Sequence, residues 1–183
     1  MRKWNAILSM AILLLFLLHA IAGGFQLAGL IPGGNRLLTI FARIMVVLIV
    51  IHAAIGTKLT VDSLNISKRA GVSYWKENRL FWVRRISGFA VMVFILAHVV
   101  LFLGTSSSGA YRLRLFEGAQ LASQILMVIA VAVHVLTNIR PLFLALGARR
   151  VREILVDVLL VLSVILLFAG AMFVVYYLRW SVI

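Results

Sequence analysis

Five long apolar runs are the feature of this sequence that most restricts its fold. Each run has roughly 20 residues, the length that an α-helix needs to cross a hydrocarbon core of about 30 Å. Hydrophobic residues make up 64% of the 183-residue chain, too large a share for a soluble domain with a polar surface. The sequence therefore predicts an all-α membrane protein, a five-helix transmembrane bundle that forms one domain over residues 1–183, with spans near 5–22, 36–55, 81–103, 116–138 and 154–178.

The charged residues lie between the apolar runs. The net charge of +13 is in the range of nucleic-acid-binding proteins, but flanking Lys and Arg residues follow from membrane topology. Thirteen of the eighteen Lys and Arg residues fall on the side of the N-terminus and four on the opposite side. We therefore expect a multi-pass protein of the cell (inner, cytoplasmic) membrane, in contact with lipid and with no nucleic-acid partner. Its N-terminus is expected in the cytoplasm and its C-terminus outside.

The chain has four histidines, and each lies in a different one of the first four apolar runs: His19, His52, His98 and His134. An ionisable side chain is costly to place inside a membrane, so each is a candidate functional residue. His52 and His134 both precede an inner basic residue by six positions, which places them about 9 Å from the inner face. His98 and His19 lie about 20 and 24 Å from that face. The depths therefore predict two pairs, His52 with His134 and His19 with His98.

Two imidazoles at one depth are the axial donor set of a six-coordinate haem. The sequence therefore predicts two haem b groups, with the four histidines as ligands of the haem irons. Satisfied core histidines are the simpler alternative, and zinc or another bare metal is disfavoured because no carboxylate or thiolate shares either depth. The chain has no cysteine, so any iron–sulfur cluster belongs to a partner.

The first apolar run also resembles a secretory signal. A basic start precedes an apolar stretch that ends at Ala20-Ile21-Ala22, a small-x-small cleavage pattern. Cleavage there would remove His19 and leave His98 without its predicted partner.

Three segments around the histidines resemble a known family. Arg84-Arg85-Ile86-Ser87-Gly88, with His98 ten residues later, is similar to an Arg-x-Ser-Gly helix that carries a haem ligand. His52-Ala53-x-x-Gly56 and His134-x-x-x-Asn138 are similar to two further ligand segments. The family is that of the dihaem cytochrome b membrane subunits of succinate dehydrogenase (succinate:menaquinone oxidoreductase) and fumarate reductase complexes.

The resemblance implies the function and the partners. The inner (proximal) haem would be held by His52 and His134, and the outer (distal) haem by His19 and His98. A flavoprotein with covalent FAD and an iron–sulfur subunit would dock on the cytoplasmic face, and dicarboxylate chemistry would take place there. The chain, with no catalytic residue of its own, would carry electrons across the membrane between the iron–sulfur subunit and menaquinone or another quinone.

A quinone also needs proton donors and acceptors near its oxygens. Candidates at the outer side are Glu117, Gln120 and Gln26, and an inner site near Arg84 and Ser87 is the alternative. Glu117 has a simpler explanation as a carboxylate at a helix N-terminus. Two other functions remain open: a dihaem cytochrome b of a different quinone-linked reductase or hydrogenase, and a haem-free membrane anchor.

Overall fold

Helices make up most of the computed structural model, which describes residues 1–71, 75, 78–102, 106–107, 110–111, 116–148 and 150–181. Lys76, Arg112, Arg114 and Arg149, which entered the charge count, lie outside the described residues. Within the described residues, five helices are long and apolar enough to cross a membrane, as the sequence predicts. They are α1 (Arg2–Leu27), α2 (Arg36–Arg69), α4 (Arg79–Phe102), α5 (Gly118–Ala145) and α6 (Val151–Ser181).

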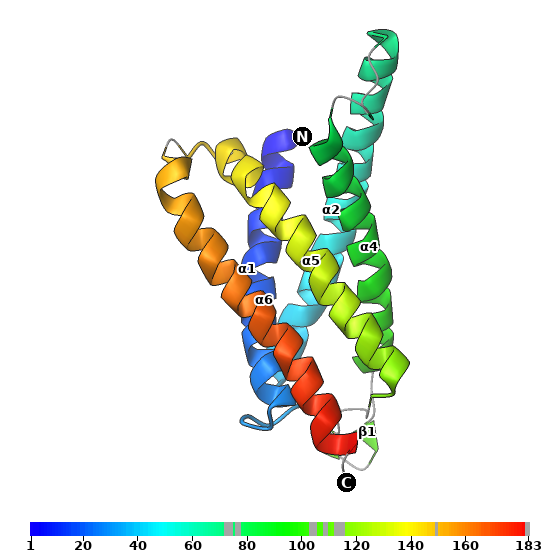
Figure 1. Ribbon diagram of the computed structural model, residues 1–183, viewed down its shortest axis with the longest axis vertical. Coiled ribbons are helices and arrows are strands. Elements are labelled where there is room, and N and C mark those ends of the chain that lie inside the picture. The colour runs from blue at the N-terminus through cyan, green and yellow to red at the C-terminus, as the bar shows by residue number, and fades with distance from the viewer. Residues whose placement is uncertain are drawn as a thin grey trace.

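The helices run alternately up and down, so that the N-terminus and the C-terminus lie at opposite ends of the bundle (Figure 1). The closest packing is between α4 and α5, followed by the pairs α5–α6, α1–α2 and α1–α6. Between α4 and α5, the two-residue strands β1 (Ser106–Ser107) and β2 (Ala110–Tyr111) pair in antiparallel fashion.

Helix α2 is longer than predicted. We expected it to end near residue 55 and a basic loop to follow, but the helix continues to Arg69. The segment from Thr57 to Arg69 contains neither proline nor glycine, so nothing in it stops a helix that the membrane span has already nucleated. The helix stops where Gly71 adopts a positive φ of 66°.

Two other predicted helix ends were also wrong. Gly23-Gly24 does not end α1, because Gly24 is buried against the ring of Phe168, where a Cβ atom would collide with that ring. The fourth span, predicted to end near residue 138, continues through Pro141 to Ala145. A membrane-spanning helix tolerates glycine and proline where a neighbouring helix packs against it or satisfies its backbone.

One cluster of mainly aromatic buried side chains lies toward the C-terminal end of α6: Leu27, Leu101, Phe116, Phe173 and Tyr176. Other buried apolar residues, among them Ile139, Leu162 and Leu166, lie outside this cluster. Many other large apolar side chains are exposed, among them Phe89 and Leu167, each at 74%. Such exposure is costly in water but is what a lipid-facing helix surface requires.

Candidate functional site

The four histidines lie in two pairs. The ring centres of His19 and His98 are 6.0 Å apart, and those of His52 and His134 are 6.4 Å apart. These are the pairs that the depth argument predicts. Each pair joins two helices, α1 with α4 and α2 with α5, that are not among the closely packed pairs of the described chain. In each pair, the imidazoles thus lie close together between two helices that have few other contacts.

The hydrogen bonds of Gln124 determine which nitrogen of His98 carries the proton. Gln124 is fully buried, and its amide nitrogen donates to Ser123 Oγ at 3.1 Å. Its amide oxygen therefore faces His98 Nδ1, at 2.7 Å, and can only accept a hydrogen bond. His98 Nδ1 must be the protonated nitrogen, which leaves the lone pair of Nε2 available to a metal.

Two serines impose the same tautomer on the other pair. Ser9 Oγ donates its one hydrogen to the Asn5 carbonyl at 2.8 Å, so it accepts from His52 Nδ1 at 3.2 Å. Ser87 Oγ donates to the Arg84 carbonyl at 3.2 Å and accepts from His134 Nδ1 at 3.3 Å. Three of the four histidines therefore present an unprotonated Nε2, the state that a metal-binding imidazole needs.

Gly88 gives His134 the space that its ring requires. A Cβ atom at position 88 would lie 3.0 Å from Cε1 and 3.2 Å from Nδ1 of that ring. Both distances are shorter than ordinary contacts, so any side chain at position 88 displaces the imidazole. Ser87 and Gly88 together therefore fix where His134 lies.

Pro141 and Arg84 form a second link between α4 and α5. Proline has no amide hydrogen, so the Thr137 carbonyl four residues earlier lacks its usual helical partner. Arg84 Nε donates to this carbonyl at 3.0 Å. The guanidinium thus replaces the missing backbone donor one turn away from His134.

We expect Arg84→Leu to lower the stability of the folded chain by about 1–3 kcal/mol, because it leaves the Thr137 carbonyl unsatisfied. Pro141→Ala restores the backbone donor and should remove most of this loss. Thermal unfolding of the two single variants and the double variant in detergent measures the coupling. Arg43→Leu, at an exposed position of α2, is the control. An equal loss from Arg84→Leu in both backgrounds would contradict the pairing of Arg84 with Thr137.

The two pairs have different surroundings. His98 lies beside aromatic rings, with ring centres 4.7 Å from Phe102 and 6.3 Å from Phe173. The His52–His134 pair lies near the Arg85 guanidinium, which interacts electrostatically with both rings. Arg85 Nε and Trp82 Nε1 are buried and have no hydrogen-bond partner in the described part of the chain. His98 is therefore surrounded by aromatic rings and the Gln124 amide, whereas the His52–His134 pair lies near a cation.

The predicted quinone residues lie at three places. Glu117 and Gln120 cap the start of α5, where the Gln120 side chain accepts from the Glu117 amide at 2.9 Å. This arrangement agrees with the simpler explanation of Glu117. Gln26 donates to the Pro32 carbonyl at 3.4 Å, at the end of α1. Arg84 and Ser87 lie beside His134, at the inner pair. A quinone-binding site at any of these places stays a prediction.

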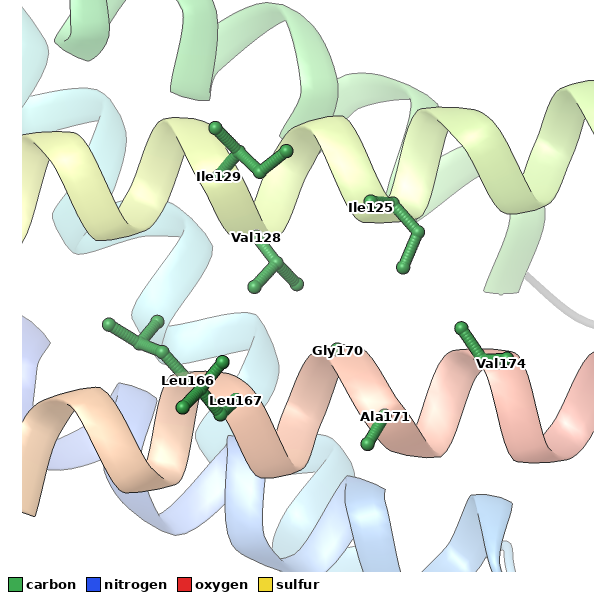
Figure 2. Close-up of a pocket in the computed structure, with 8 residues that line it drawn as sticks. All are labelled: Ile125, Val128, Ile129, Leu166, Leu167, Gly170, Ala171 and Val174. Carbon is green, nitrogen blue, oxygen red and sulfur yellow. The ribbon is translucent and has the colours of Figure 1, made fainter.

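A groove of about 350 Å³ lies between α5 and α6, away from the histidines (Figure 2). Its lining is aliphatic throughout: Ile125, Val128, Ile129, Leu166, Leu167, Gly170, Ala171 and Val174. None of these side chains can hydrogen-bond to a quinone oxygen, so the groove suits hydrocarbon rather than a head group.

The described residues do not provide enough ligands in one place for a zinc site. There, no three His, Cys, Asp or Glu side chains gather as ligands of one metal ion. Zinc takes four protein ligands in structural sites and three in catalytic ones. Each histidine pair offers two protein ligands, fewer than either kind of zinc site takes.

Sequence reasoning missed Ser9 and Gln124. The glutamine at position 124, within an apolar span, was a signal that a polar partner lies inside the bundle, but the sequence does not identify that partner. Ser9 gave a weaker signal, since the serine hydroxyl can hydrogen-bond to a carbonyl of its own helix.

Comparison with known proteins identifies no relative: no protein-family model, curated protein or solved structure matches the chain.

Proposed function

We propose that the chain is a dihaem cytochrome b. The observation that carries the proposal is the presence of two imidazole pairs whose ring centres are 6.0 and 6.4 Å apart. An imidazole nitrogen binds a metal at about 2 Å and the ring is about 2 Å across, so two rings facing one metal from opposite sides have centres about 6 Å apart. Both pairs meet this condition.

The hydrogen bonds to Nδ1 support the same proposal. Histidines that bind a metal usually donate their second N–H to a protein acceptor, which fixes the ring and increases its basicity. His98, His52 and His134 have such acceptors in Gln124, Ser9 and Ser87. In all three the hydrogen-bonded nitrogen is Nδ1, so Nε2 is the nitrogen left for a metal, and the ring of a second histidine lies about 6 Å away in each pair.

The unused donors at the inner pair also fit this cofactor. The Arg85 side chain is partly buried and its guanidinium lies over the Phe81 ring, but its buried Nε has no acceptor, and leaving a buried donor unsatisfied is costly. Haem b carries two carboxylates, and Arg85 Nε and Trp82 Nε1 are buried donors on the helix next to His134. We assign these two side chains to a haem carboxylate.

More specifically, we propose the membrane subunit of a succinate dehydrogenase or fumarate reductase complex. The two haems, each able to take up and release one electron, would join the two faces of the membrane. His52 and His134 would hold the inner one, and His19 and His98 the outer one. FAD and iron–sulfur clusters would belong to partner subunits on the cytoplasmic side, where the N-terminus and most Lys and Arg residues are proposed to lie.

Purification of the tagged chain from its native membrane tests this assignment. We expect a subunit with covalent flavin to co-purify and succinate to reduce both haems. Purification with a hydrogenase or an unrelated flavin reductase would contradict the succinate dehydrogenase assignment and leave the dihaem proposal standing. A chain without haem would contradict both.

We expect Gln124→Leu to raise the midpoint potential of the outer haem only. Without its acceptor, His98 becomes a less basic ligand and stabilises the ferric state less. The expected shift is on the order of 60 mV, which corresponds to a tenfold change in the ratio of ferric to ferrous affinity. Redox titration with Gln120→Leu as the control measures it. Two unchanged potentials would contradict the role of Gln124.

A further inference from the structure

Helix α2 extends well beyond the membrane. Its apolar part ends near Gly56, and the next 13 residues, Thr57 to Arg69, continue the helix for about 20 Å. Figure 1 shows this end of α2 rising past the ends of the other helices, on the same side as the N-terminus. We call the helical segment 57–69 the α2 projection.

One side of the α2 projection is exposed and both basic and apolar. Its exposed side chains are Thr57, Lys58, Val61, Asp62, Asn65, Ile66, Lys68 and Arg69. Three are cations and one is an acid. Val61 is 49% exposed and Ile66 is 67% exposed, and Trp75 beyond the helix is 65% exposed. Covering these apolar side chains with a partner surface would remove them from water, which is favourable.

The membrane surface is too far away to cover the far end of the α2 projection. The head-group region adds about 5–8 Å to each side of the hydrocarbon core. Lys68 and Arg69 lie 12 and 13 residues beyond Gly56, about 18–20 Å along the helix. The potential of anionic lipids decays within a Debye length of about 8–10 Å. The charge at this end therefore suits a protein rather than a lipid.

We propose that the α2 projection is the docking site for an acidic face of a water-soluble partner subunit. Lys58, Lys68 and Arg69 supply the charge complementarity, and Val61 and Ile66 supply the apolar contact. His52 precedes Lys58 by six residues on the same helix, so the α2 projection begins about 9 Å along the helix from that histidine. The proposal rests on the proposed function, since it identifies the segment that receives the partner.

Cysteine labelling tests whether a partner protein or the membrane surface covers the α2 projection. The chain has no cysteine, so Ile66→Cys gives a single site for a membrane-impermeant maleimide. Leu30→Cys, 72% exposed at the opposite end, is the control. In vesicles with about 30% phosphatidylglycerol, we expect position 66 of the chain alone to react as fast as in phosphatidylcholine vesicles. Slow labelling only with the anionic lipid would show a membrane-bound segment and overturn the proposal.

In the complex purified with its flavoprotein, we expect labelling at position 66 to be about tenfold or more slower, and labelling at position 30 unchanged. Equal labelling of position 66 with and without the partner would overturn the proposal.

Charge reversal provides a second readout. We expect Lys68→Glu with Arg69→Glu to lower the covalent flavin that co-purifies by about tenfold or more, with haem content unchanged. Arg36→Glu, at the other end of α2, is the control. If the double variant retained all of its flavin, the docking proposal would be wrong and the proposed function would still stand. A wild-type chain that carries two haems but no flavoprotein contradicts the partner in the proposed function, and with it the docking proposal.

Discussion

Replacing His98 with alanine is expected to reduce the haem content of the purified chain from two to one. His19→Ala is expected to remove the same haem, because a six-coordinate haem that loses one imidazole loses half of its axial ligation. His52→Ala and His134→Ala are expected to remove the other. Haem content per chain, together with the reduced-minus-oxidised spectrum, measures which component disappears.

Double variants make this prediction specific to the pairs. His19→Ala with His98→Ala is expected to match either single variant, because both changes affect one haem. His98→Ala with His52→Ala is expected to leave no haem. If instead His19→Ala and His98→Ala removed different spectral components, the pairing would be wrong. Circular dichroism of each variant shows whether the helices are retained.

Gly88→Val is expected to remove the inner haem without changing a ligand. A Cβ at this position lies 3.0 Å from the His134 ring, and the branched side chain of valine adds further atoms. Ser87 is hydrogen-bonded to Nδ1 of this ring, so a displacement of the imidazole also strains that bond. Overpacking of this kind costs about 1–3 kcal/mol, and loss of ring support weakens metal binding about 10- to 100-fold.

The control for Gly88→Val is Gly170→Ala. A Cβ at position 170 would lie 3.7 Å from Val128, an ordinary contact. Gly170→Ala should keep both haems, and the haem content of Gly88→Ala should lie between those of Gly170→Ala and Gly88→Val. Retention of the inner haem by Gly88→Val would contradict the position given to His134.

Much of the candidate site follows from the sequence because the rise of a helix is fixed. A rise of about 1.5 Å per residue turns spacing from the flanking charges into depth, and depth paired His52 with His134 and His19 with His98. The structure places these rings together. Depth contains no information on how each helix is rotated against its neighbour, so the contacts of Ser9 and Gln124 could not be predicted.

The ends of the helices were predicted less well, for a different reason. Glycine and proline often end helices in water-soluble proteins. Here Phe168 packs against Gly24, and Arg84 donates to the carbonyl that Pro141 leaves without a partner. Both compensations come from other helices, which a local pattern does not show. The α2 projection was missed because basic residues after an apolar run were interpreted as a loop, although the segment has no helix breaker.

The most direct test is a dithionite-reduced minus oxidised spectrum of the purified chain, with haem and protein quantified on the same sample. Two histidine pairs predict two low-spin haem b groups per chain and a clear α-band. No α-band, or clearly fewer than two haems per chain, would contradict the central claim.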